Sequence, residues 1–388
     1  METMLDYIKQ TPDVLNNIIN NSKEYTEQLV DFYKNNNYES IYLIASGSSY
    51  NGCLIAKQFM EHILHKEVRL QTPFTFYNHE TLSLDKTMLI AVSQSGCSTN
   101  TLDCLRQLKQ KGYKTACLVG RDNNDAKDIA DLTINWQVGE EKIGFVTKGV
   151  SSLACFLNVF ALELALSLNI IDETKLEHAK AQLLKTQTIQ PEIVENTTKM
   201  FNEHKQDFIN RNKVIFLSSG PNIGTITEGA LKIKETSCIV AEQYEIEEFL
   251  HGPLYPSTPD DLIIIVDNND DPSSQRMVQI ANALLDVTQK VYMVSNTDKF
   301  LNKEQQIRTS ADTCSYTSPL YKLSALQVLA YLMTEATNKY EPHENVKQFK
   351  KANKVATKSK NNLYLNLQNI KWSIIASLLF LICLSQIF

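Results

Sequence analysis

The chain has 388 residues, of which 43% are hydrophobic and 21% charged, and its formal net charge at pH 7 is −6. This length allows two domains of ordinary size, and the composition is typical of a soluble globular protein. The acidic balance argues against nucleic acid as a partner.

The cysteines and the amino terminus indicate the compartment. Eight cysteines are scattered through the sequence without a CxxC pair. We therefore expect reduced thiols in a cytoplasmic protein, and no metal site. The amino-terminal residues also lack the apolar stretch of a secretory signal.

The first half of the chain predicts an α/β domain. Residues 1–34 are expected to form an amino-terminal helical segment, whose helix starts at Thr11-Pro12-Asp13. Beyond it, helix-like stretches alternate with short apolar runs at 41–45, 88–92, 115–119 and, more weakly, 132–136. This alternation predicts βαβ units and a parallel sheet in a first domain over 35–190. Within that domain, the apolar stretch 151–168 is predicted to be a buried helix rather than a membrane span.

Serine-rich loops follow two of these predicted strands. They read SGSS at 46–49 and SQSGCSTNT at 93–101. In open α/β sheets, ligands bind at the carboxyl ends of the strands, where a helix N-terminus attracts an anion. The hydroxyl donors suit a phosphate monoester, and the lack of a Walker lysine and of a GxGxxG pattern makes a nucleotide less favoured. The alternative is that these residues only cap helices.

The second half repeats this design. A polar helical stretch over 172–210, with 191–212 as the connector, leads into a second domain over 213–345. We expect its strands at 214–217, 261–266 and 290–294, a helix at 225–236, and an apolar helix at 320–338 that packs between the halves. Because both halves open with an apolar strand and a Ser/Gly loop, the sequence indicates a domain duplication.

A candidate proton-transfer site lies in the segment 228–253, EGALKIKETSCIVAEQYEIEEFLHGP. Glu228, Lys232 and Glu235 fall on one face of the predicted helix. His251 follows in the HGP turn. Carboxylate, amine and imidazole groups close together can handle protons at neutral pH. The alternative is a solvated helix face followed by an ordinary loop histidine.

These motifs together resemble a known family. SGSS, SQSGCSTNT, VTKG at 146–149 and EGALKIKE…HGP are similar to those of the tandem sugar isomerase (SIS) domain family. The likeness is greatest to the isomerase half of glucosamine-6-phosphate synthase and its glutaminase-free deaminase and deglycase relatives, and it spans roughly residues 4–345. It implies two SIS domains, each a parallel sheet flanked by helices in a flavodoxin-like three-layer arrangement.

The resemblance also implies roles for individual residues. The positions that match the sugar-phosphate loops are Ser49, Ser93, Gln94, Ser95 and Ser98. Glu235 matches the carboxylate that moves a proton between C1 and C2, with Lys232 and Glu228 as its helical neighbours. His251 matches the histidine that opens the sugar ring from the other subunit, which implies a homodimer with a shared active site and no cofactor.

The sequence departs from the synthase pattern at several positions. Cys97 stands where the synthase usually has an acidic residue, and Val146 where it has a phosphate-contacting serine. The chain starts at the isomerase half, so we expect that glutamine does not supply ammonia within it. In the Lys-rich tail, 346–372, both Lys351 and Lys354 are candidates for a Schiff-base lysine, the alternative being a solvated tail.

The last residues, 373–388, are almost wholly apolar and follow this Lys-rich segment. They are shorter than the roughly 20 residues that a membrane-spanning helix prefers. Three interpretations stay open: a membrane anchor with cytoplasmic lysines, an extension produced by a shifted reading frame, and a helix buried on the dimer.

The favoured function is that of a phosphosugar isomerase and deaminase. It would convert glucosamine 6-phosphate to fructose 6-phosphate and ammonia, or the reverse, by enolisation at C1 and C2. The nearest alternative is a deglycase that splits a fructosamine 6-phosphate into glucose 6-phosphate and an amine. An alternative of another class is a non-catalytic regulator that binds a sugar phosphate.

Overall fold

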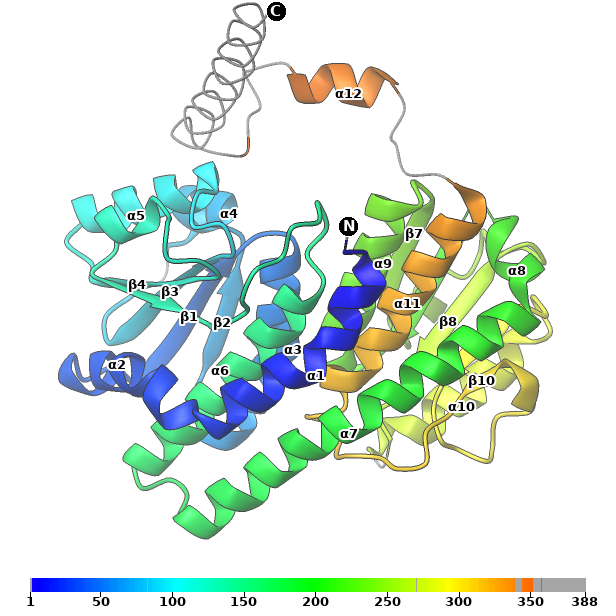
Figure 1. Ribbon diagram of the computed structural model, residues 1–388, viewed down its shortest axis with the longest axis horizontal. Coiled ribbons are helices and arrows are strands. Elements are labelled where there is room, and N and C mark those ends of the chain that lie inside the picture. Colours follow the sequence, from blue (N-terminus) through cyan, green and yellow to red (C-terminus); the bar gives the residue numbers. More distant parts are fainter. Residues whose placement is uncertain are drawn as a thin grey trace, which may run out of the picture.

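Two parallel sheets of five strands each, flanked by helices, form the core of the protein in a computed structural model (Figure 1). The structure describes residues 2–81, 83–211, 213–269, 271–338, 344–351 and 357. The α/β class with two helix-flanked parallel sheets is confirmed.

The first sheet has the strand order β2-β1-β3-β4-β5. Its strands are β1 (Ser40–Ala45), β2 (Val68–Gln71), β3 (Thr87–Ser93), β4 (Thr115–Val119) and β5 (Leu132–Asn135). Every residue of β3 and β4 is buried, as expected for parallel strands covered on both faces. The edge strand β2 was not predicted, because its four residues, VRLQ, include only two apolar ones.

Helices follow the strands directly and bring their first turns to one edge of this sheet. They are α3 (Ser48–Leu64) after β1 and α5 (Thr99–Gln110) after β3, with the short α4 (Pro73–His79) between them. The helix α6 (Lys148–Ser167) is long and apolar enough to cross a membrane, but 94% of its most apolar window is buried inside the protein. The prediction of a buried helix is therefore confirmed.

The amino-terminal helix begins earlier than predicted. There are two helices, α1 (Met4–Asn20) and α2 (Ser22–Asn35), and the start signal at Thr11-Pro12 lies inside α1. Thr3 and Asp6 form a capping box that begins α1. A proline inside a helix leaves the carbonyl four residues earlier without its partner. Here the Nε2 amide of Gln190 donates to that carbonyl, of Ile8, at 2.9 Å.

The second sheet has the order β7-β6-β8-β9-β10, the same relative order as the first. Its strands are β6 (Lys213–Ser218), β7 (Val240–Glu245), β8 (Leu262–Val266), β9 (Val291–Val294) and β10 (Gln306–Ile307). The repeated order supports the predicted duplication. Sequence reasoning missed β7, an edge strand whose polar residues hide the alternation.

The remaining helices connect and cover these sheets. They are α7 (Glu173–Glu203), α8 (Lys205–Ile209), α9 (Ile223–Thr236), α10 (Ser273–Leu284), α11 (Pro319–Thr337), α12 (Glu344–Lys351) and the short 3-10 turns η1 (Ala126–Asp128), η2 (Gly220–Asn222), η3 (Glu248–His251) and η4 (Lys303–Gln305). As predicted, α11 packs between the halves: Leu323 belongs to the core of the first sheet and Leu326 to that of the second. The predicted domain limits stay predictions.

The helices α3 and α9 join the two halves at very close range. An added Cβ on Gly224 of α9 would lie 2.6 Å from the backbone nitrogen of Ile55 in α3. Only glycine permits this approach. The crossing brings the first turn of α3, next to the serine loops, against the helix that carries Glu235.

Candidate functional site

A cavity of about 790 Å³ lies at the carboxyl ends of β1, β3 and β4. Both serine-rich loops line it, and so does Glu235 at the end of α9. The lining residues are Ser46, Ser48, Ser49, Gln94, Ser95, Ser98, Gly120, Arg121, Asp122, Asn135, Gly139, Glu140, Glu141, Ile143, Gly144, Val146 and Glu235. Segments from both halves of the chain therefore meet around one space.

The loop after β3 turns tightly against its surroundings. Gly96 has φ of +60°, and an added Cβ would lie 2.4 Å from the Cβ of Asn124. Ser93 is buried beneath the loop, where its Oγ donates to the Oγ of Ser98 at 3.0 Å. Among the predicted phosphate residues, Ser49, Gln94, Ser95 and Ser98 line the cavity, whereas Ser93 supports the loop from below.

Arg121 is a lining residue that sequence reasoning missed. It follows β4, whose carboxyl end lies at the same edge of the sheet as the serine loops. Its Nε donates to the carbonyl of Ser95 at 3.0 Å, and its Nη2 lies 3.6 Å from the Sγ of the buried Cys97. The signal was present in the GRD sequence directly after a predicted strand. A guanidinium at this place adds positive charge beside the loop, which favours an anionic ligand.

Residues 139–146 form another wall of the cavity, and Glu141 ties this wall to its neighbours. The Nε2 amide of Gln94 donates to Glu141 at 2.9 Å. The carboxylate also accepts the backbone N–H groups of Thr147 and Lys148 at the start of α6, at 2.7 and 3.0 Å. A carboxylate at a helix N-terminus is stabilised by the unpaired N–H groups and the helix dipole.

The helix α9 carries a chain of three charged groups. The Nζ of Lys232 lies 3.3 Å from Glu228 and 2.5 Å from Glu235. The side chains of Glu228 and Lys232 are fully buried, whereas that of Glu235 is 38% exposed where it reaches the cavity. The alternative of a solvated helix face is therefore wrong for this segment.

Residues from the first half of the protein bind Glu228, which is the buried end of this row of charged groups. From α3, the Oγ of Ser48 and the Nδ2 of Asn51 donate to the two oxygens of Glu228 at 2.9 and 2.7 Å. A buried carboxylate is costly unless it is paired and hydrogen-bonded. These two residues, absent from the sequence-based predictions, satisfy that need. No pattern in the sequence signals a contact between residues so far apart.

Burial and the neighbouring groups shift the pKa values of Glu228 and Lys232 in opposite directions. Burial raises the pKa of the Glu228 carboxyl, and the neighbouring Lys232, Asn51 and Ser48 partly offset that rise. Burial lowers the pKa of Lys232, but the two flanking carboxylates outweigh it, so the net shift is upward. Lys232 is therefore held as an ammonium that orients and balances Glu235.

Other predicted residues lie outside this cavity. His251 is exposed on η3 and is not among the residues that line it. Lys351 lies in α12, and Lys354 lies outside the described residues, as does the apolar segment 373–388. Thr357, three residues beyond Lys354, accepts the N–H of Thr99 at 3.2 Å, which brings this point of the tail to the first turn of α5.

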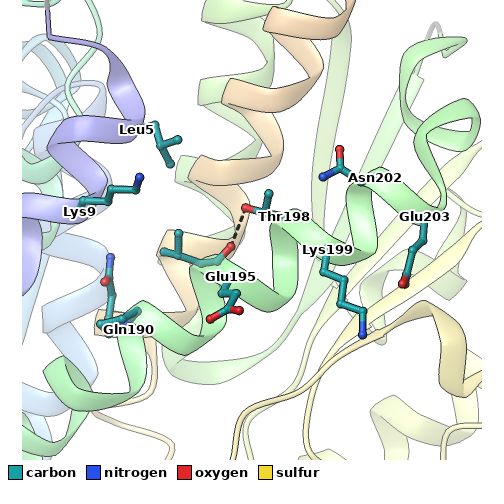
Figure 2. Close-up of a pocket in the computed structure, with 10 residues that line it drawn as sticks. Leu5, Lys9, Gln190, Glu195, Thr198, Lys199, Asn202 and Glu203 are labelled. Atoms are coloured by element: carbon teal, nitrogen blue, oxygen red, sulfur yellow. Dashed lines mark hydrogen bonds between the residues drawn. The ribbon is translucent and has the colours of Figure 1, made fainter.

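A larger cavity, of about 1000 Å³, lies elsewhere, between α1 and α7 (Figure 2). Leu5 and Lys9 of α1 face Glu195, Lys199 and other residues of α7 across it. None of the predicted site residues lines it. We therefore take the cavity beside Glu235 as the candidate active site.

At the carboxyl ends of its strands, the second sheet carries different side chains from those of the first sheet. Asp267 directly follows β8, the strand that corresponds to β3. Its carboxylate accepts the hydroxyls of Ser274 and Ser295, and the ammonium of the buried Lys322 donates to its backbone carbonyl at 2.7 Å. A buried carboxylate therefore stands at this edge of the second sheet, where the first sheet presents the hydroxyls of its serine loop.

Comparisons with known proteins agree with this architecture. A glutamine–fructose-6-phosphate aminotransferase [isomerizing] of Thermococcus kodakarensis is 27% identical over 332 residues, which are 84% of this chain and 54% of that protein. The chain thus spans about half the length of the curated relatives it matches.

Solved structures show the same fold. The C-terminal domain of glucosamine-fructose-6-phosphate aminotransferase from Francisella tularensis superposes with a TM-score of 0.78 at 21% identity, covering 87% of this chain and 97% of that one. Glucosamine-6-phosphate deaminase from Thermotoga maritima gives a TM-score of 0.63 at 16% identity, covering 85% and 96%.

The profile of the SIS domain matches twice, over residues 36–162 and 207–334. The two matches lie on the two sheets and together cover more than half of the chain. The chain belongs to the SIS domain family, and it is homologous to the isomerase domain of glutamine–fructose-6-phosphate aminotransferase.

Proposed function

We propose that the protein is an amine-releasing phosphosugar isomerase that interconverts glucosamine 6-phosphate with fructose 6-phosphate and ammonia, independently of glutamine. The observation that carries this proposal is the common cavity of Glu235 and the serine loop after β3. A six-carbon sugar phosphate has its phosphate at one end and its reacting carbons at the other. The cavity offers anion-binding groups and a partly exposed carboxylate for these two ends.

The reaction needs one proton to move between neighbouring carbons. In the open-chain substrate, the carboxylate of Glu235 takes the proton from C2. The electron pair left behind forms a C1–C2 double bond while the C1 oxygen takes up a proton, which gives an enol. The same carboxyl returns the carbon proton to C1, and the nitrogen gives up a proton that replaces the one taken up by the oxygen, which leaves an imine at C2. Water adds to this imine, and ammonia leaves to give fructose 6-phosphate. Lys232, at 2.5 Å, orients Glu235 and balances its charge before the proton arrives.

Ring opening requires a second acid–base group near the ring oxygen, and His251 has suitable chemistry. Its exposed position on η3, outside the cavity of its own chain, favours a role in the site of a partner chain. The proposal therefore includes a homodimer in which each cavity is completed by the partner.

The test is turnover of glucosamine 6-phosphate by the purified full chain, with fructose 6-phosphate and ammonia measured together. We expect equal amounts of both products without glutamine. Glu235→Gln should lower kcat by about 100-fold or more, since general acid–base catalysis contributes that much. Sugar-phosphate binding by calorimetry should change little. Undiminished turnover in Glu235→Gln would contradict the role of Glu235 in proton transfer. Sugar-phosphate binding without turnover in the unaltered chain would favour a non-catalytic regulator.

A fructosamine 6-phosphate is a second candidate substrate, cleaved to glucose 6-phosphate and an amine. It needs the same proton transfer between C1 and C2. The specific observation in its favour is a mainly apolar cavity of about 640 Å³ next to Glu235, whose lining includes Ile143, Phe145 and Thr236.

A further inference from the structure

The segment between β5 and α6, residues 136–147, forms one wall of the candidate active site. Its backbone is irregular, and Gly139, Glu141 and Val146 are among its residues that line the cavity. An irregular segment takes its position from contacts with the elements around it, because it belongs to no ladder or helix of backbone hydrogen bonds. The contacts of this wall therefore decide how the cavity is shaped on that side.

The amino-terminal helix α1 holds the wall at two points. The Oη of the buried Tyr7 accepts the backbone N–H of Lys142 at 3.0 Å and donates to Glu2 at 2.9 Å. The Nζ of Lys148, the residue that follows the wall, donates to Gln10 at 3.0 Å and lies 5.0 Å from the centre of the Tyr7 ring. An ammonium over an aromatic ring is attracted by it. Tyr7 thus fixes both the middle and the end of the wall.

Glu141, the neighbour of Lys142, connects the wall to the loop after β3. Its Oε1 accepts the backbone N–H groups of Thr147 and Lys148 at 2.7 and 3.0 Å, and its Oε2 accepts the Nε2 amide of Gln94 at 2.9 Å. A carboxylate can only accept hydrogen bonds, so the NH2 group of Gln94 has to face it. Glu141 therefore fixes both the place of the Gln94 amide and the way it is turned.

The side chain of Gln94 lies between two glycines that leave it little freedom. A Cβ added to Gly149 would lie 2.6 Å from its Nε2 and Oε1, and one added to Gly120 would lie 2.8 Å from its Cγ. Gln94 also lines the cavity, one residue after the end of β3. A small displacement of Glu141 should therefore change what Gln94 presents to a ligand.

We propose that Tyr7 and Glu141 are positioning residues for the binding of the sugar phosphate. Tyr7 holds the backbone at Lys142, which places Glu141, and Glu141 fixes the amide of Gln94 in the cavity. This inference rests on the proposed function, because it takes Gln94 as a group that contacts the ligand. Tyr7 is not among the residues that line the cavity, and Glu235 is oriented from α9 by Lys232. The contacts from Tyr7 therefore act on affinity rather than on proton transfer.

The first test is Tyr7→Phe, which keeps the ring beside Lys148 and removes only the hydroxyl. We expect KM for glucosamine 6-phosphate and the Kd of fructose 6-phosphate to rise by about 3-fold or more, the value of one lost hydrogen bond. The value of kcat should stay within about twofold, which separates positioning for binding from a general loss of structure. Tyr25→Phe is the matched control, since the hydroxyl of Tyr25 in α2 accepts from Asn17 at the surface.

The second test asks whether Tyr7 and Glu141 act through the same contact. In Glu141→Gln, a carbonyl oxygen can still accept the two backbone N–H groups, but the new NH2 group faces the NH2 group of Gln94. We expect KM and Kd to rise by about 10-fold, because the hydrogen bond is lost and two donors oppose each other. Adding Tyr7→Phe to Glu141→Gln should then raise them by less than about 1.5-fold, since coupled residues are not additive.

Different failures are distinguishable. An unchanged KM and Kd in Tyr7→Phe, or effects that multiply in the double variant, would overturn the positioning role. If thermal unfolding shows that Tyr7→Phe does not fold, hydrogen exchange of the unaltered chain decides: fructose 6-phosphate should slow exchange across 139–147, and unchanged exchange there would overturn the proposal. An unaltered chain that neither binds fructose 6-phosphate nor turns over glucosamine 6-phosphate would overturn the proposed function itself.

Discussion

Glu228, Lys232 and Glu235 of α9 each have a partner within a few ångströms, and the outermost partner belongs to the other half of the chain. Lys232 lies between Glu228 and Glu235, and Asn51 of α3 donates to Glu228 at 2.7 Å. Sequence spacing could predict that the three α9 residues share a face. It could not predict their burial, because the same spacing is common on solvated helices.

The contact from Asn51 gives a residue-scale prediction. Asn51→Ala leaves one oxygen of a buried carboxylate without its donor, so we expect the free energy of unfolding to fall by about 1–3 kcal/mol. Lys232 should then shift toward Glu228 and away from Glu235, which lowers kcat. Urea denaturation and steady-state turnover measure the two effects.

Asn78→Ala is the matched control, since Asn78 is exposed on α4 and donates to the carbonyl of Phe74, within its own helix. We expect a much smaller change from it. Equal losses in the two variants would show that the Asn51 contact does not stabilise the charged chain.

Arg121 is a site residue that the sequence alone did not identify. Strand ends in a parallel sheet meet at one edge, so the residue after each predicted strand was a candidate for the site. Serines were recognised there because two loops repeated them. A lone arginine after β4 gave no repeat, and only the observed strand order brings it beside Ser95.

At the scale of elements, the crossing of α3 and α9 brings the site residues of the two halves together. The two helices come from different halves of the chain, and Gly224 lets them approach until an added Cβ would meet the backbone of Ile55. Helix-period reasoning predicted α9 within two residues of its start and placed a helix-like stretch after β1. Their contact could not be predicted, because nothing in either helix alone identifies its partner.

Gly224→Ala tests this crossing. The near atoms include backbone, which cannot move away as a flexible side chain would, so we expect the helices to separate. Overpacking of this kind costs about 1–3 kcal/mol of stability, and turnover should fall because Ser48 and Glu228 move apart. Thermal unfolding and kcat are the measurements.

Gly144→Ala serves as the stability control, since an added Cβ there has nothing within 4 Å. It should leave thermal unfolding nearly unchanged. A Gly224→Ala protein as stable as the unaltered chain would mean that the crossing is looser than the structure indicates.

At the scale of the whole molecule, two copies of one fold present different side chains at the matching edges of their sheets. The first sheet presents serines and Arg121 to the cavity, whereas the second presents Asp267 and the buried Lys322 at the matching edge. The repeat of strand and Ser/Gly loop predicted the duplication from sequence. The difference between the two edges lies in residues beyond those loops, which the pattern of strand and loop does not reveal.

The proposal that Glu235 of one chain works with His251 of another is tested most directly by mixing inactive variants. Glu235→Gln and His251→Asn should each be nearly inactive as homodimers. In a mixed dimer, one cavity carries both substitutions and the other carries neither, so a 1:1 mixture after subunit exchange should recover about a quarter of the activity of the unaltered protein. A mixture that exchanges subunits yet recovers nothing, or a Glu235→Gln homodimer that turns over normally, would contradict the proposal.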